Sequence, residues 1–429
     1  MKKYMNYGSI FLLFIITIFF GGCTKDDAVE LDEKGEVINP EEGRQIVSGD
    51  PSLNSFLITS KDETVYTVDA ETGEWTSIYS FPDYTDLELV ADYKDDTIYV
   101  TTDDNSINAL SVTNKRFLWD TPMLEYDFSS NGVTPPICID GVCYASGGSG
   151  VVVAVNQNDG LLKWYYTTDP DGELDYVLNE NAIPLVYGDK VFVFSEEGFV
   201  IDLPAYMHVL DKETGTLLRK IELPYEVTGT PYFKDNVLYL PAKNLYALDA
   251  ETLDVIWTFE ANGVGTPAVS NGKLVVNAIP TGELISSVLY CIDLASNSVI
   301  WQIDTGTDTL WSPLIVQNVV FSNYDNGSSF AFTTSARLFA LNLATGEQLW
   351  YNNDVVIDHS PVFANGRLFF RGHNLAGEGG TDENVGLLSM DANTGRVLWL
   401  NTFFRYGSAL VPLVVAENGV FGPSYYRGN

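Results

Sequence analysis

A repeated 13-residue frame constrains the fold of this chain more than any other feature of its sequence. Leu245–Trp257 reads LYALDAETLDVIW, Leu338–Trp350 reads LFALNLATGEQLW and Leu387–Trp399 reads LLSMDANTGRVLW. The other copies, two of which lack the final Trp, are Val65–Ser77, Ile107–Trp119, Val152–Trp164, Met207–Arg219 and Leu289–Trp301. The Asp, Asn or Ser at the fifth position recurs eight times between residues 69 and 391, at a mean spacing of 46 residues. This spacing suits one four-stranded sheet for each repeat.

Each copy has the pattern of a β-hairpin. Alternating apolar residues predict a first strand, Asp-x-x-Thr-Gly predicts a tight turn, and a second strand ends at Trp. The Asp side chain accepts bonds from backbone amides within such a turn, and Gly tolerates a positive φ. Another hairpin precedes most copies, as where Pro267 opens a strand and Asn271-Gly272 makes the turn. The sequence therefore predicts four antiparallel strands per repeat.

The two ends of the chain are expected to complete one sheet together. Leu410–Phe421 is a hairpin with no second hairpin after it, whereas Val65–Tyr79 has no proline-type strand before it. If both ends share a sheet, the ring closes and no open sheet edge remains. We therefore predict an all-β fold, a single eight-bladed β-propeller of four-stranded antiparallel blades, over residues 44–429.

The frame A-x-D-x-x-T-G-x-x-x-W resembles the tryptophan-docking motif of PQQ-like β-propellers, and it covers nearly the whole chain after the N-terminal segment. This resemblance implies that six Trp side chains pack between neighbouring blades, namely Trp119, Trp164, Trp257, Trp301, Trp350 and Trp399. The family contains quinoprotein dehydrogenases, which bind pyrroloquinoline quinone and calcium, and also non-catalytic scaffolds.

Residues 1–22 have the pattern of a lipoprotein signal peptide. Lys2 and Lys3 precede an apolar run from Ile10 to Phe20 that is too short to span a bilayer comfortably. Phe20-Gly21-Gly22-Cys23 resembles a lipobox, which implies that Cys23 is the acylated first residue of the mature chain. The alternatives are an ordinary signal peptide and an uncleaved anchor.

Residues 23–43 are interpreted as the lipidated Cys and a flexible acidic tether, because they hold few large apolar side chains. Thr24-Lys25-Asp26-Asp27 resembles the acidic export signal of Bacteroidota surface lipoproteins, and a solvated charge run is the alternative. The predicted localisation is therefore the bacterial outer membrane, on its periplasmic face or at the cell surface.

The charge of the chain excludes one class of partner. Removal of Lys2 and Lys3 leaves 21 basic and 58 acidic residues, a net charge of −37. Phosphate neutralisation needs clustered basic residues, so nucleic acid is not an expected partner. Anionic lipid surfaces repel such a chain, and its membrane attachment has to come from the acyl anchor.

Cys138 and Cys143 flank an Asp140-Gly141 turn. A two-residue hairpin here places the two cysteines opposite each other as a non-hydrogen-bonded pair, close enough for a disulfide. Export to an oxidising compartment favours that disulfide, and two buried thiols are the alternative. Cys291 is expected to be a buried thiol.

No motif in the sequence points to catalysis. The chain has no vicinal Cys pair, no C-x-x-C-H haem sequence, no G-x-S-x-G elbow and no phosphate-binding loop. None of the histidines, His208, His359 and His373, has a second ligand at metal-site spacing. We predict no catalytic, cofactor-binding or metal-binding residues, and no cofactor.

Loop lengths indicate where a partner could bind. The turns at one face of the predicted propeller are short, whereas the opposite face carries the long connections. Aromatic residues are favoured at the centres of protein interfaces. The predicted interaction face consists of Tyr176, Tyr206, Phe330, Phe332, Phe403, Phe404 and Tyr406.

A lipid-anchored PQQ-like propeller without cofactor residues is similar to the BamB family, whose members belong to the outer-membrane β-barrel assembly machinery. The resemblance implies a non-catalytic scaffold that binds an outer-membrane complex for barrel assembly, uptake or secretion. Two alternatives stay open: a surface lipoprotein that binds glycan or another extracellular ligand, and a quinone-dependent dehydrogenase.

Overall fold

The computed structural model describes residues 46–47, 55–81, 92–102, 106–122, 134–147, 150–168, 176–178, 183–197, 204–284, 286–307, 312–324, 336–357, 360–375, 384–404, 413–416 and 419–421. These residues all belong to one compact unit, Asn39–Asn429. The predicted signal peptide, Cys23 and the tether up to residue 43 lie outside the described residues. Within the described part of the chain, no helix is long and apolar enough to cross a membrane.

The described elements are antiparallel strands and one short 3-10 helix, η2 (Thr402–Phe404). The strands form seven sheets, five of which take strands that follow one another in the chain into a single four- or five-stranded group. Three of these five are β4 (Asp92–Lys94), β5 (Thr97–Thr102), β6 (Ser106–Ser111) and β7 (Arg116–Pro122); β8 (Ile137–Ile139), β9 (Val142–Gly147), β10 (Val151–Asn156) and β11 (Leu162–Thr167); and β17 (Tyr232–Lys234), β18 (Val237–Pro241), β19 (Leu245–Asp249) and β20 (Val255–Phe259).

The other two sheets of this kind differ in strand length and number. One consists of β21 (Ala268–Ser270), β22 (Lys273–Ala278), β23 (Ser286–Asp293) and β24 (Ser298–Thr307). The other has a fifth strand and consists of β12 (Tyr176–Leu178), β13 (Leu185–Tyr187), β14 (Lys190–Glu197), β15 (Ala205–Asp211) and β16 (Leu217–Leu223). Here β12 and β13 both pair with β14, at different parts of its length.

Two four-stranded groups are joined into an eight-stranded sheet. Its strands are β25 (Leu314–Val316), β26 (Val319–Tyr324), β27 (Arg337–Asn342), β28 (Gln348–Ile357), β29 (Val362–Ala364), β30 (Arg367–Asn374), β31 (Val385–Asp391) and β32 (Val397–Asn401). The end of β28 pairs with the end of β30, where Val356 lies opposite His373. A Cβ atom at Gly372 would collide with the carbonyl oxygen of Val356, so the close approach of these strands needs glycine there.

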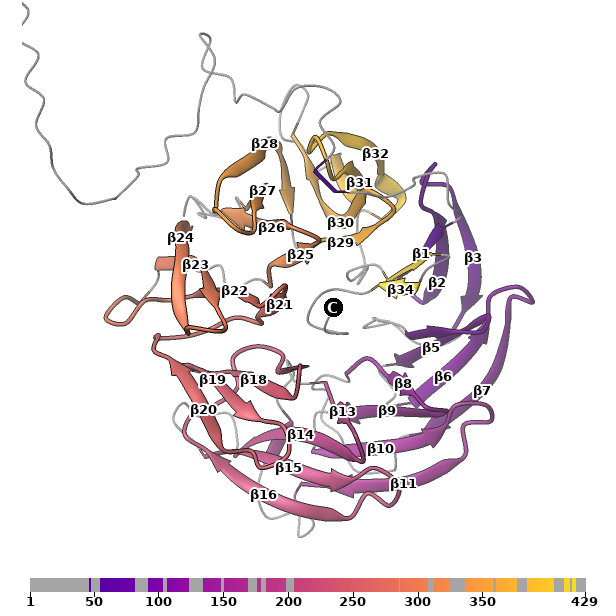
Figure 1. Ribbon diagram of the computed structural model, residues 1–429. Coiled ribbons are helices and arrows are strands. Elements are labelled where there is room, and N and C mark those ends of the chain that lie inside the picture. The colour runs from indigo at the N-terminus through magenta and orange to yellow at the C-terminus, as the bar shows by residue number, and fades with distance from the viewer. Residues whose placement is uncertain are drawn as a thin grey trace, which may run out of the picture. The chain divides into compact units, whose positions relative to one another are not determined.

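The two ends of the chain share a sheet, as predicted from the unpaired terminal hairpins. This sheet contains β1 (Ser55–Lys61), β2 (Thr64–Asp69), β3 (Trp75–Ser80), β33 (Leu413–Ala416) and β34 (Gly419–Phe421). β1 pairs with β2 on one side and with β33 on the other. The yellow strand β34 lies at the edge of the sheet that contains the indigo strands β1 and β2, and β33 separates it from β1 (Figure 1). The N-terminal segment thus supplies three strands, whereas the sequence pattern indicated only the two around Asp69.

The hydrophobic core lies between neighbouring sheets. One buried cluster combines Leu245 and Ala247 of β19 with Leu274 and Val276 of β22. Strands that are buried on both faces have near-continuous apolar sequences, as in β10, which reads VVVAVN. Each four-stranded group is therefore packed against its neighbours, and this includes the two groups within the eight-stranded sheet.

Candidate functional site

The turn at the centre of each repeat has the structure that its residue types predict. In the copy at Asp211, one carboxylate oxygen accepts hydrogen bonds from Glu213 N at 3.1 Å, Thr214 N at 2.8 Å and Thr214 Oγ1 at 2.7 Å. Gly215 has a φ of +68°. The hydrogen bond from the Thr214 hydroxyl is the main reason that the pKa of Asp211 lies below its usual value. The repeated Asp is therefore a structural acceptor.

The repeated Trp side chains contact the next repeat along the chain. Trp164 Nε1 donates to the carbonyl oxygen of Lys212, and Trp301 and Trp350 make the same bond to Leu343 and Ala392, each at 2.9 Å. Each acceptor directly follows the turn Asp or Asn of the next copy. Each of these Trp residues lies in a strand pair that has a register shift next to it.

Each of these indoles also lies against the turn glycine of the next repeat. A Cβ atom built on Gly215 would lie 2.6 Å from Trp164, and one on Gly395 would lie 2.7 Å from Trp350. The turn therefore needs glycine for its positive φ and for the space that the indole takes. Gly160 and Trp119 have the same relationship, at 2.5 Å.

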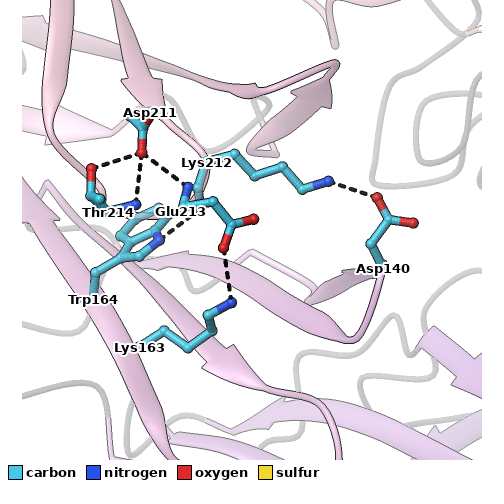
Figure 2. Close-up of polar contacts among 7 residues, drawn as sticks. All are labelled: Asp140, Lys163, Trp164, Asp211, Lys212, Glu213 and Thr214. Atoms are coloured by element: carbon cyan, nitrogen blue, oxygen red, sulfur yellow. Dashed lines mark hydrogen bonds and ion pairs between the residues drawn. The ribbon is translucent and has the colours of Figure 1, made fainter.

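Ion pairs surround one of these contacts (Figure 2). Lys212, whose carbonyl accepts the Trp164 bond, has its Nζ 2.6 Å from Asp140 Oδ2. Lys163 Nζ lies 3.5 Å from Glu213 Oε2, in the same turn as Asp211. Both acidic partners are largely exposed, so solvent screens these ion pairs and they contribute little to stability.

One repeat without Trp contacts the next repeat through an Arg side chain. Arg219 stands at the Trp position, and its Nη1 donates to the carbonyl oxygen of Thr252 at 2.9 Å. Trp257, in the following copy, is half-buried and packs against the buried cluster between its own sheet and the next. All six repeated Trp residues thus pack in clusters that join one repeat to the next.

The last repeat contacts the first in the same way. Trp399 Nε1 donates to Ala70 O at 3.2 Å, and Gly73 lies beneath its indole. A groove of about 510 Å³ follows this contact and is lined by Trp75, Trp399, Asn401 and their neighbours. Trp75 is 43% exposed, and its ring stacks on Phe403 at a centroid distance of 4.2 Å. Lys61 Nζ lies 4.2 Å from the centre of the same Phe403 ring.

The predicted aromatic interaction face is described only in part. Phe404 is 1% exposed in the core, so its ring is not available to a partner. Phe403 is half-buried. Tyr206 lies within β15 and not in a loop, and Lys220 Nζ is 3.9 Å from its ring centre. Tyr176 lies in β12, but its side chain is outside the described atoms, as are Phe330, Phe332 and Tyr406.

His208 is buried in a polar network between two sheets. Its Nδ1 lies 2.8 Å from the Tyr166 hydroxyl and its Nε2 lies 2.8 Å from Ser195 Oγ. Burial lowers the pKa of His208 to about 4, and Lys220 adds to that shift. Both His208 and Ser195 are at most 1% exposed, so this Ser–His pair does not face a substrate. The hydrogen bond between His208 and Tyr166 of β11 joins the two sheets.

Cys138 and Cys143 face each other in β8 and β9 and form a disulfide, with their Cα atoms 4.0 Å apart. Cys291 is buried, and desolvation raises the pKa of its thiol to about 12. His373 is half-buried in β30, and His359 lies outside the described residues.

Calcium and quinone, which some members of the resembling family bind, do not fit the described part of the chain. Calcium needs converging oxygen ligands. In the described ranges, no three His, Cys, Asp or Glu side chains come together so that they could hold a metal ion. The disulfide joins cysteines five residues apart in a hairpin, not adjacent ones.

The outer strands expose apolar residues that the sequence pattern did not single out. These side chains follow the turn of their repeat and are 38% to 59% exposed; they include Leu118, Leu162, Leu218, Val255, Ile256, Val299, Ile300 and Leu398. Leu349 stands at an equivalent position and is only 9% exposed. These side chains stand one or two residues before the Trp position of their repeat, so the outer strands expose apolar groups at two recurring positions.

Comparisons with known proteins place this fold. The sequence matches the profile of the outer membrane protein assembly factor BamB over residues 61–206, 197–286 and 286–411. The chain is 24% identical over 342 residues to tetrathionate hydrolase of Acidithiobacillus ferrooxidans, which covers 72% of this chain and 64% of that protein. It is 24% identical over 226 residues to BamB of Yersinia pestis, and this match covers 50% of this chain and 50% of that protein. The chain therefore spans less than two thirds of the length of these two relatives.

The crystal structure of BamB from Moraxella catarrhalis superimposes with a TM-score of 0.56 at 16% identity, covering 79% of this chain and 96% of that one. This likeness shows the fold alone. One of the two sequence relatives has the name of an enzyme and the other does not, so similarity leaves catalysis open. Because its matches extend from residue 61 to residue 411, the chain belongs to the family described as outer membrane protein assembly factor BamB.

Proposed function

We propose that this chain is a non-catalytic, lipid-anchored scaffold of the bacterial outer membrane that binds other envelope proteins. The proposal rests on the structural role of the side chains that recur in each repeat. The repeated Asp residues stabilise the turns, and the repeated Trp and Gly residues join each repeat to the next, as at Asp391, Trp350 and Gly395. A rigid body with exposed apolar side chains on its outer strands suits binding better than chemistry.

The same contacts support a closed ring of eight blades. The eight-stranded sheet contains two four-stranded groups, each built around its own copy of the repeat. Trp399 meets the first repeat as Trp350 meets the last, and β33 completes the sheet of β1. A closed ring leaves no long sheet edge for unwanted pairing.

The anchor and the location belong to the same proposal. Acylated Cys23 would attach the chain to the outer membrane, and residues 24–43 would let the propeller reach a membrane complex. The family description supports a barrel-assembly partner, and an uptake or secretion complex is equally compatible with the anchor. The net charge of −35 for the whole chain disfavours nucleic acid as a partner.

Co-purification from gently solubilised outer membranes tests the scaffold function. A tagged full-length chain is expected to recover an outer-membrane barrel insertase or transporter at near-stoichiometric yield. Cys23→Ala is the matched control, because it removes the acyl anchor and leaves the propeller unchanged. This variant is expected to leave the membrane fraction.

Two results would overturn the proposal. A wild-type chain that is recovered from the membrane without any partner is not a scaffold. Steady hydrolysis of tetrathionate by the purified chain, above the rate in buffer, would show that it is an enzyme like its relative of that name.

A glycan-binding surface lipoprotein is the second candidate, and the groove beside Trp399 favours it. The partly exposed indole of Trp75 is held in place by Phe403, and the polar residues Thr72 and Glu74 lie next to it. A flat aromatic ring beside polar groups is an arrangement that suits sugar binding. Binding of soluble polysaccharides that Trp75→Ala abolishes and Trp399→Phe retains would support this candidate over the scaffold.

A further inference from the structure

Two of the contacts between repeats match at four positions. In the first, Trp350 lies over Gly395, and Asn352 Nδ2 donates to the Gly395 carbonyl oxygen at 2.6 Å. In the second, Trp119 lies over Gly160, and the Thr121 hydroxyl donates to the Gly160 carbonyl oxygen. We call these the Trp350 junction and the Trp119 junction.

The remaining two matched positions lie at the surface. A Leu precedes each Trp, namely Leu349 in the Trp350 junction and Leu118 in the Trp119 junction. An Asn stands two residues after the turn Asp or Asn of the next repeat, namely Asn393 and Asn158. The two junctions therefore offer the same apolar side chain and the same carboxamide.

The Trp350 junction is occupied by Ile46–Val47, a piece of this chain whose backbone is bent. Asn393 Oδ1 accepts hydrogen bonds from Ile46 N at 2.6 Å and from Val47 N at 2.8 Å. Val47 is 1% exposed and belongs to the same buried cluster as Leu349 and Trp350. The bound segment lies more than 300 residues before its acceptor in the sequence, so a separate chain could make the same contacts.

The Trp119 junction is open. Leu118 is 38% exposed, whereas Leu349 is 9% exposed. Asn158 is exposed, and its carboxamide makes no hydrogen bond to any other residue in the described ranges. Both features that hold Val47 in the Trp350 junction are thus present and available.

Each of the other junctions lacks at least one of the two features. Leu398 precedes Trp399, but Glu71 stands where the two matched junctions have Asn. An apolar segment that covered Glu71 would remove a carboxylate from water, which costs far more than covering an amide. In the junction of Trp164, the positions hold Lys163 and Glu213, which form an ion pair with each other.

We propose that the Trp119 junction binds a short segment of a partner protein that has a β-branched apolar residue, in the way that the Trp350 junction binds Ile46–Val47. The apolar side chain packs on Leu118, and two successive backbone amides donate to Asn158 Oδ1. This inference rests on the proposed scaffold function, because it assigns the surface through which a partner chain is held.

A peptide that copies residues 44–50, Arg-Gln-Ile-Val-Ser-Gly-Asp, is the probe. It has a photoreactive diazirine residue in place of Val and is irradiated with the full chain without its signal peptide. We expect cross-links, mapped by mass spectrometry, to concentrate on β7 and on residues 156–160. Leu118→Asp and Asn158→Ala are each expected to lower the yield by about tenfold, since each removes one of the two contacts.

Leu398→Asp is the matched control, because it places the same charge at the equivalent position of a junction with Glu71. This variant is expected to cross-link at the wild-type level, and all variants are expected to keep the wild-type melting temperature. Cross-links spread evenly over the outer strands, or a yield that Leu118→Asp leaves unchanged, would overturn the inference. If the peptide result is negative while a membrane complex still co-purifies, the scaffold function stands and only this surface is wrong.

Discussion

The indole Nε1 of Trp399 donates a hydrogen bond to the carbonyl oxygen of Ala70, 329 residues earlier in the chain. Trp350 makes the same bond to Ala392, which is only 42 residues away. One local contact thus serves both successive repeats and the two ends of the chain. The contribution of this contact to the free energy of unfolding can be measured at any of these positions.

Trp350→Ala is expected to lower the free energy of unfolding by about 3–5 kcal/mol, because it leaves a cavity and removes a buried hydrogen bond. Urea denaturation followed by fluorescence and circular dichroism measures this loss. Leu398→Ala, on the exposed surface of β32, is the control and is expected to change the stability by no more than about 0.5 kcal/mol. A loss at Trp350 as small as that of the control would contradict a docking role.

Gly395→Ala and Gly141→Ala separate the cost of a positive φ from the cost of a steric clash with the indole. Both residues have a positive φ, but a Cβ atom on Gly141 meets nothing within 4 Å, whereas one on Gly395 lies 2.7 Å from Trp350. Gly141→Ala is expected to cost about 1 kcal/mol for its backbone conformation alone. Gly395→Ala is expected to cost about 1–3 kcal/mol more, because the indole has to move. Equal losses in urea denaturation would show that the indole does not press on the turn.

His208 is expected to make stability depend on pH. Its pKa is about 4 in the folded chain and near 6.5 when unfolded, so between these values the unfolded chain binds the additional proton. The stabilisation is complete above pH 6.5 and is lost as the pH falls towards 4, by about 3 kcal/mol in total.

The measurement is the unfolding free energy of the wild type and of His208→Gln at several pH values. The neutral variant removes this titration and leaves all 58 acidic residues in place. The difference between the two curves is expected to change between pH 6.5 and 4 only. Parallel curves across this range would mean that His208 is not buried in its neutral form.

Reduction of the Cys138–Cys143 disulfide is expected to cost about 2 kcal/mol, the loop-closure contribution of a short loop. The Cys138→Ser, Cys143→Ser double variant should match the reduced wild type in urea denaturation. Mass spectrometry of the unreduced chain after alkylation is expected to show that these two cysteines are not labelled. Labelling of both under oxidising conditions would show that the disulfide does not form.

Local chemistry explains why the repeat architecture could be predicted. The turn at Asp211 needs only an acceptor side chain, a Thr and a Gly within five residues, so its structure follows from adjacent sequence. The Asp140-Gly141 hairpin places Cys138 opposite Cys143 for the same reason. The role of the Trp residues followed from the family resemblance, since a single position in a strand does not show which sheet it contacts.

Pairings between distant strands could not be predicted in the same way. The third N-terminal strand, β1, has no repeat motif and takes its place through β2 and β33. β12 contains Tyr176, a residue of the predicted loop face, and it is a strand because β14 extends far enough to pair with it. Phe404 was assigned to the interaction face, yet it packs in the core with Leu57 and Tyr66.

The sequence by itself determined the all-β class, the period of the sheets, the turn structure and the pairing of the chain ends, because these depend on side chains within one hairpin or on the count of hairpins. Only the tertiary structure decided which apolar surface remains open. Leu118 and Leu349 have the same place in the same motif, but one is exposed and the other is covered. Leu349 shares its buried cluster with Val47, which is distant in sequence and donates to Asn393 only in the folded chain.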